Sequence, residues 1–169
     1  MKVSIFGKNL RNLWLSIATT ALLVVLDQWV KILAVKYLKG AVAQVYLGGL
    51  VVVEYAENRG AFLSLGANLS DAARLWIFVI GVFAILMFCI ASLWKSLAHL
   101  PSAFAYALVI SGGIGNLIDR IQQGYVVDYV HMGFTSLRTG VFNIADMAIS
   151  LGLVMLLFMQ YFSKAEEKN

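Results

Sequence analysis

The chain has very few cysteine, proline and charged residues. It contains one cysteine and one proline in 169 residues, so a disulfide scaffold and a proline-rich linker protein are both excluded. Charged residues make up 13% of the chain, whereas a soluble domain carries about 25%. The net charge of +4 comes from bases scattered among apolar runs. This distribution does not indicate binding to nucleic acid.

Hydrophobic residues are present in excess. They make up 61% of the chain, and the mean hydropathy is +0.83. We therefore interpret the chain as an integral membrane protein. A membrane-spanning helix needs about 20 mostly apolar residues, and four segments qualify, at about 13–35, 75–94, 102–119 and 142–162. The predicted fold is an all-α membrane protein of four transmembrane helices in one domain over residues 1–169, with an extramembrane loop over 36–74.

The N-terminus and the first loop each need a separate interpretation. Lys2, Lys8 and Arg11 precede an apolar run, as in a secretory signal, but no small-x-small cleavage site follows. We therefore expect an uncleaved first helix. In the loop, two β-rich runs over 41–56 flank Gly48-Gly49, which predicts a small β-hairpin or sheet at the membrane surface.

Four spans place both termini on one side of the membrane, and nearly all the polar residues then fall on the other side. Those residues are Asp27, Lys31, Glu54, Glu57, Asn58, Arg59, Asn116, Asp119, Arg120, Asp128, Asn143 and Asp146. The count of basic residues does not decide which side is cytoplasmic. The basic tail before the first helix favours cytoplasmic termini.

Ionisable residues within or beside membrane spans are candidates for function by default. Asp27 and Lys31 are spaced for a helical ion pair, which either neutralises both residues or lets Asp27 orient a polar site. Arg120 is placed to reach the headgroups, to pair with Asp119 or to hold a substrate group. Small residues repeat every four positions from Ala103 through Ala107 and Ser111 to Gly115, which predicts close helix packing.

Asp128 and Asp146 form the best candidate catalytic pair. Both are expected near the same membrane interface, on segments joined by a short loop. Two carboxylates that approach one another have separated pKa values, which leaves one acid and one base. The alternatives are a helix N-terminal charge for Asp146 and a solvated loop position for Asp128. His99 and His131 fall on opposite sides, so we predict no metal site and no cofactor.

Five sequence blocks occur in one order along the chain. They are Asp27-Gln-Trp-Val-Lys31, Asn58-Arg-Gly-Ala-Phe62, Gly112-Gly-Ile-Gly-Asn-Leu-Ile-Asp-Arg120, Val126-Val-Asp-Tyr-Val130 and Phe142-Asn-Ile-Ala-Asp146. Together they resemble the signal peptidase II (lipoprotein signal peptidase) family of bacterial inner-membrane aspartyl endopeptidases. The resemblance covers the chain except its tails. Phe62 departs from the family's pattern, which often has a second alanine there, and leaves the shape of the neighbouring subsite open.

The resemblance implies a function and a set of site residues. It implies cleavage of prolipoproteins before a diacylglyceryl-modified cysteine, with an active site near the periplasmic face and cytoplasmic termini. It implies Asp128 and Asp146 as the catalytic pair. The substrate-binding and supporting positions that it implies are Asn58, Gly60, Asn116, Arg120, Asn143, Asp27, Lys31 and Asp119. The expected partners are lipid-modified prolipoproteins and membrane lipids, with no nucleic acid, and we expect a monomer.

Two other classes of protein remain as alternatives. A small proton-coupled transporter would use Asp27, Asp128 and Asp146 as relays, and would need polar groups along a path across the bilayer. The predicted span at 75–94 contains no charged residue, which argues against such a path. A non-enzymatic four-helix scaffold would leave the clustered polar motifs without a role.

Overall fold

Four long helices and one small sheet make up the computed structural model, which describes residues 2–60, 70, 72–73, 76–134 and 137–166. The helices are α1 (Lys2–Leu38), α3 (Gly81–Ser96), α4 (Leu100–Gln123) and α5 (Ile144–Glu166), and a π-helical turn over Trp76–Ile80 leads into α3. Four segments are long and apolar enough to cross a membrane: Gly7–Leu38, Trp76–Ser96, Leu100–Gln123 and Ile144–Ser163.

The expected helix bounds are corrected at several ends. The helix predicted over 13–35 runs from Lys2 to Leu38, so its length of about 55 Å exceeds the hydrocarbon thickness. The helix predicted over 102–119 begins at Leu100, next to Pro101, and continues to Gln123. The last helix begins at Ile144 and not at residue 142. Residue 75, the first of the second predicted span, lies outside the described residues.

Helix α4 is the central element, and α1, α3 and α5 pack around it. Of its most apolar stretch, 61% is buried inside the protein, against 17% or less for the other three helices. Small residues permit this packing. A Cβ added at Gly115 would lie 2.6 Å from Asp27 Oδ2 on α1 and 3.3 Å from the Ala145 Cβ on α5. The predicted small-residue packing is thus confirmed at Gly115.

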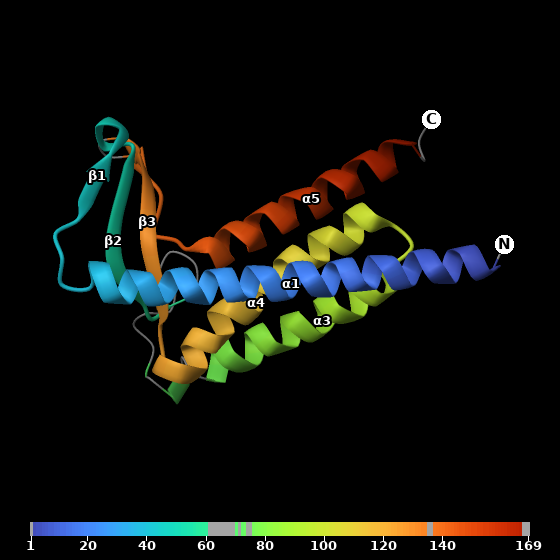
Figure 1. Cartoon of the computed structure of the whole chain (residues 1–169), viewed down its shortest axis with the longest axis horizontal. Coiled ribbons are helices and arrows are strands. Elements are labelled where there is room, and N and C mark those ends of the chain that lie inside the picture. Colours follow the sequence, from blue (N-terminus) through green and yellow to red (C-terminus); the bar gives the residue numbers. More distant parts are fainter. Residues whose placement is uncertain (1, 61–69, 71, 74–75, 135–136, 167–169) are drawn as a thin grey trace.

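A four-stranded antiparallel sheet lies at one end of the helices, in the order β1 (Gln44–Tyr46), β2 (Val51–Asn58), β3 (Val126–Phe134) and β4 (Leu137–Arg138). The predicted hairpin around Gly48-Gly49 is the β1–β2 pair. Both glycines have positive φ, which a turn between these strands requires. The termini lie at the opposite end of the helices (Figure 1).

Strand β3 was not among the elements predicted from the sequence, in which only a loop was expected between the spans at 102–119 and 142–162. Val127 and Tyr129 pack with Ala34 at the end of α1. Side chains alternate along a strand, so Asp128 points to the other face. A bulge in β2 between Val53 and Ala56 sets the register that pairs Ala56 with Asp128. Asn58, two residues further on, therefore lies diagonally opposite Asp128 on the same face.

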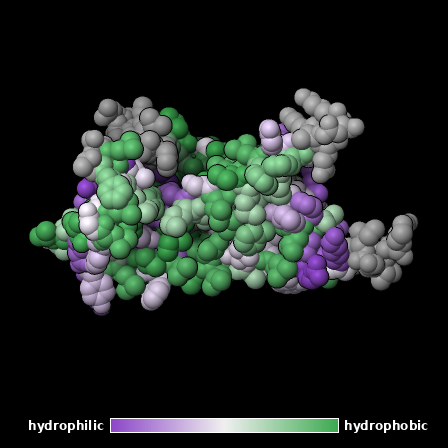
Figure 2. Space-filling model, turned by 90° about the horizontal axis from the view of Figure 1, so that it is seen from above, coloured by the Kyte–Doolittle hydropathy of each residue, from purple (hydrophilic) through white to green (hydrophobic). Residues whose placement is uncertain are grey.

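Hydrophobic and hydrophilic residues are separated along the surface of the molecule. Hydrophobic residues cover most of the middle of the visible face, and hydrophilic residues gather towards the ends (Figure 2). Large exposed apolar side chains on α1, α3 and α5 include Trp29, Phe88 and Leu157. This band is what lipid-facing helices present to acyl chains.

Candidate functional site

Asp128 is held on β3 by amide donors on both of its carboxylate oxygens. Asn143 Nδ2 donates to Oδ1 at 2.7 Å, and Asn58 Nδ2 donates to Oδ2 at 3.0 Å. The residue is 1% exposed. Asn58 comes from β2, where the bulge sets its register, and Asn143 is the residue immediately before α5. Asp128 is therefore a buried carboxylate in a strand and not the solvated loop residue of the alternative interpretation.

Asp146 lies in the first turn of α5, where it takes part in a reciprocal cap. Its backbone N–H donates to Asn143 Oδ1 at 2.9 Å, and its own Oδ2 accepts from the Asn143 backbone N–H at 3.2 Å. This is a capping box, in which an N-cap residue and the residue three positions later satisfy each other's free donors. The alternative interpretation of Asp146 as a helix N-terminal charge is thus correct but incomplete, because its Oδ1 faces Asn116.

Two asparagines join the two aspartates into one network. Asn116 Nδ2 donates to Asp146 Oδ1 at 2.8 Å, and Asn143 Nδ2 donates to Asn116 Oδ1 at 3.1 Å as well as to Asp128. Both asparagines are buried. Each aspartate therefore receives amide donors from the same linked pair of side chains, although the two carboxylates belong to a strand and a helix.

A buried ion cluster lies behind this network, between α1 and α4. Lys31 Nζ is 2.8 Å from Asp27 Oδ2 and 3.1 Å from Asp119 Oδ2. Asp27 Oδ1 also accepts from the Ala145 N–H at the start of α5, and Asp119 Oδ2 accepts from the Val127 N–H of β3. Of the two predicted roles, the ion pair is present, and both acids also fix the segments that carry Asp128 and Asp146.

Gln28 belongs to this cluster but was not singled out in the sequence. Its Nε2 donates to Asp119 Oδ1 at 3.0 Å and to the Gly115 carbonyl at 3.1 Å, which ties α1 to α4. Its position beside Asp27, in the first of the five blocks, was the available signal. A helix face that carries Asp27 and Lys31 also brings their neighbour to the helix interface.

Arg120 connects the network to the segment that follows β2. Its guanidinium donates to the Gly60 carbonyl at 2.9 Å and to the Asn116 carbonyl at 3.3 Å, and the Gly60 N–H donates to Asn58 Oδ1. The Arg120 guanidinium also lies 5.7 Å from the centre of the Phe78 ring. Arg120 therefore binds backbone carbonyls in this structure and not Asp119, which binds Lys31 instead. The departure at Phe62 lies outside the described residues.

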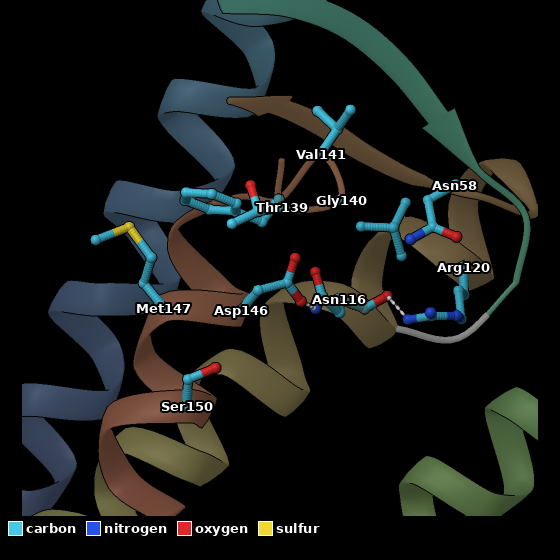
Figure 3. Close-up of a pocket in the computed structure, with 11 residues that line it drawn as sticks. Asn58, Asn116, Arg120, Thr139, Gly140, Val141, Asp146, Met147 and Ser150 are labelled. Carbon is cyan, nitrogen blue, oxygen red and sulfur yellow. Dashed lines mark hydrogen bonds between the residues drawn. The ribbon is translucent and has the colours of Figure 1, made fainter. Parts of the chain in front are cut away.

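A cavity of about 260 Å³ opens beside the network (Figure 3). Asp146, Asn116 and Arg120 line one part of it, and Met147 and Ser150 on α5 continue its wall. The opposite wall is the segment from Thr139 to Phe142, which the sequence analysis missed. This segment pairs back onto β3, because the Phe142 N–H donates to the Val130 carbonyl at 2.7 Å. All ten predicted site residues lie in this hydrogen-bonded network or in the ion cluster attached to it.

Burial is the main cause of the raised pKa of Asp128. Loss of hydration, together with the negative charge of Asp146, raises the pKa of Asp128 to about 7, although the hydrogen bonds from Asn58 and Asn143 oppose this shift. An aspartate with this pKa can hold a proton near neutral pH. In the part of the chain that the structure describes, no group of three or more His, Cys, Asp or Glu side chains is placed to hold a metal ion. The site can therefore offer acid–base chemistry from paired carboxylates.

The sequence profile described as "Signal peptidase (SPase) II" matches residues 19–162. The chain belongs to the signal peptidase II family. The family's enzymes are aspartic-type proteases, and the chain is a multi-pass bacterial membrane enzyme of this type. The resemblance read from the five blocks is confirmed.

Individual relatives agree with the family assignment, and a solved structure has a similar fold. The chain is 32% identical over 154 residues to a lipoprotein signal peptidase of Streptococcus agalactiae serotype Ia, covering 89% of this chain and 92% of that protein. It is 33% identical over 151 residues to one of Streptococcus pyogenes serotype M1, covering 85% and 90%. A bacterial membrane enzyme solved by the in meso method at 2.3 Å resolution has a similar fold, with a TM-score of 0.81, 24% identity, and coverage of 89% of this chain and 90% of that one.

Proposed function

We propose that this protein removes signal peptides from prolipoproteins by cutting before a diacylglyceryl-modified cysteine, with Asp128 and Asp146 as the catalytic pair. The observation that carries the proposal is the linkage of both carboxylates through Asn116 and Asn143 beside the cavity. The carboxylates come from different elements, and only the fold brings them to one network.

The chemistry follows from one shared proton. One carboxylate takes a proton from water, which attacks the scissile carbonyl, while the protonated partner donates to the carbonyl oxygen or to the leaving nitrogen. The two groups titrate as a pair. Asp146 lines the cavity and Asp128 lies behind it, so the water binds on the cavity side of Asp146. Arg120 and Asn58 hold the backbone around Gly60 as a wall for the substrate.

The position of the site explains the choice of a lipid-modified substrate. The network lies where α4 and α5 meet the sheet, at the end of the helices opposite the termini (Figure 1). Acyl chains hold a diacylglyceryl-cysteine at the membrane interface, since each buried CH₂ contributes about 0.8 kcal/mol. The lipid thereby delivers the peptide bond to this depth and orients it. We place this end at the periplasmic face of the inner membrane and both termini in the cytoplasm.

The direct test is cleavage of synthetic prolipoprotein peptides by the purified protein. A diacylglyceryl-modified peptide should be cut immediately before the modified cysteine, and the matched peptide with a free cysteine should be cut far more slowly. A chelator should leave the rate unchanged, because the proposed chemistry uses no metal. Equal cleavage of both peptides, or loss of cleavage with the chelator, would contradict the proposal.

A further inference from the structure

The Lys31 ammonium uses all three of its N–H bonds on oxygen atoms. Its Nζ lies 2.8 Å from Asp27 Oδ2, 3.1 Å from Asp119 Oδ2 and 3.0 Å from Asn116 Oδ1. The side chain is 4% exposed. Because an ammonium group donates and never accepts, each of these three partners must present an acceptor to it.

This requirement fixes the direction of the Asn116 amide. With its carbonyl oxygen on Lys31, its NH₂ group points to Asp146 Oδ1, 2.8 Å away. A turn of the amide by 180° would place NH₂ against the ammonium group and a carbonyl oxygen against a carboxylate. Asn143 adds a second donor to the same carbonyl at 3.1 Å. Its own amide is set by backbone groups, the Asp146 N–H and the Val127 carbonyl.

We infer that Lys31 is a positioning residue that acts on Asp146 through the Asn116 amide. The inference rests on the proposed function and deepens it, because it gives the buried lysine a role beyond neutralising Asp27 and Asp119. Lys31 comes from α1, Asn116 from α4 and Asp146 from α5, so the contact between two helices sets the hydrogen bonding of a carboxylate on a third. The hydrogen bond from Asn116 holds Asp146 Oδ1 as an acceptor in one fixed orientation.

The test is a double-mutant cycle on cleavage of the diacylglyceryl-modified peptide. Lys31→Met, which keeps the length of the side chain, should lower kcat by about 10²-fold, the effect of misplacing a reacting group by about 1 Å. KM should change little, because Lys31 does not line the cavity. In the Asn116→Ala background, Lys31→Met should cause no further loss of kcat. Lys36→Met is the matched control, since Lys36 is exposed on the same helix and should leave kcat unchanged.

The outcomes separate this inference from the proposed function. Losses that multiply, or a Lys31→Met effect confined to KM, would overturn the positioning role. An Asp128→Asn variant is assayed in parallel, and its normal activity would overturn the proposed pair instead. Thermal unfolding in detergent monitors the fold of every variant. If Lys31→Met unfolds because Asp27 and Asp119 are left unpaired, the same cycle is run in the Asp119→Asn background, which removes one buried charge, and multiplying losses there overturn the inference.

Discussion

At the scale of single residues, Asp128 has the most specialised surroundings in the site. It is almost completely buried, yet both of its oxygens accept hydrogen bonds from asparagine amides. Burial favours the neutral acid, whereas amide donors favour the carboxylate. Their balance leaves a group with a pKa of about 7, which exchanges a proton near neutral pH.

The pH dependence of cleavage follows from that balance. A pKa raised to about 7 means that Asp128 keeps its proton below this pH and loses it as the pH rises through this value. Above it Asp128 has no proton left to donate, so kcat/KM should fall about tenfold per pH unit. Measuring kcat/KM from pH 5 to pH 9 checks this. A rate that keeps rising to pH 9 would contradict the shared-proton mechanism.

The residues of the site were more predictable than their contacts. Asp128 and Asp146 stood out because an acid in an apolar run needs a reason to be there. Their partners were less visible. Asn116 and Asp146 are 30 residues apart in the chain, and Asn58 and Asp128 are 70 apart. Local spacing does not determine such contacts, so Gln28 and the segment from Thr139 to Phe142 were missed.

At the scale of elements, the start of α5 combines a structural cap with the site. Asn143 accepts from the Asp146 N–H with its Oδ1 and donates to Asp128 with its Nδ2. The cap supports the helix, and the donor serves the carboxylate. One side chain therefore contributes separately to stability and to activity.

Two substitutions of Asn143 should separate these contributions. Asn143→Ala removes the cap and should cost about 1 kcal/mol of unfolding free energy beyond Asn143→Ser, because serine is also a good N-cap residue. Neither variant can donate an amide to Asp128, so both should lose activity to a similar degree. Unfolding in detergent and kcat for the lipid-modified peptide measure the two effects. A fully active Asn143→Ser variant would contradict the role of the amide donor.

The contact between α4 and α5 should be equally sensitive to added volume. A Cβ on Gly112 would collide with the Ala145 carbonyl and approach Ile149 Cγ1 to 2.7 Å. Gly112→Ala should therefore destabilise the protein by about 1–3 kcal/mol. Gly81→Ala is the control, because nothing lies within 4 Å of its Cβ position. Equal unfolding midpoints for the two variants would contradict the close approach.

Helices and strands were predictable from the sequence when the residues that determine them are close together in the chain. The four helices follow from long apolar runs, although Asp27 and Lys31 interrupt the first run and Asp146 lies near the start of the last. The β1–β2 pair follows from two β-rich runs around a Gly-Gly turn. Strand β3 was missed, although Val126, Val127 and Val130 favour a strand. Its partner β2 lies about 70 residues earlier, and the bulge that sets their register has no sequence signature here.

At the scale of the whole molecule, buried charge is concentrated at the end that carries the sheet. Asp27, Lys31, Asp119 and Asp128 are buried there. In the described half nearer the termini, the buried polar residues include Asn12 and Ser16, which carry no charge. A proton pathway needs ionisable groups across the full thickness of the bilayer. The arrangement is therefore that of a one-sided site.

The proposed orientation can be measured in cells with a Cys89→Ser background. Val42 lies in the loop before β1 and is 89% exposed. A membrane-impermeant maleimide should therefore label a Val42→Cys variant from the periplasmic side. Lys8→Cys, near the N-terminus of α1, should be labelled only after the inner membrane is opened. The reverse pattern would place the site at the cytoplasmic face and contradict the proposed delivery of substrate.

The most direct test of the central claim is the rate at which each aspartate variant cleaves the diacylglyceryl-modified peptide. Mass spectrometry measures the product formed. Asp128→Asn and Asp146→Asn should each lower cleavage by at least about 10³-fold while the protein still inserts and folds. Glu54→Gln, which changes a half-exposed carboxylate on β2, should cleave normally. Product formed at the wild-type rate by either aspartate variant would contradict the account.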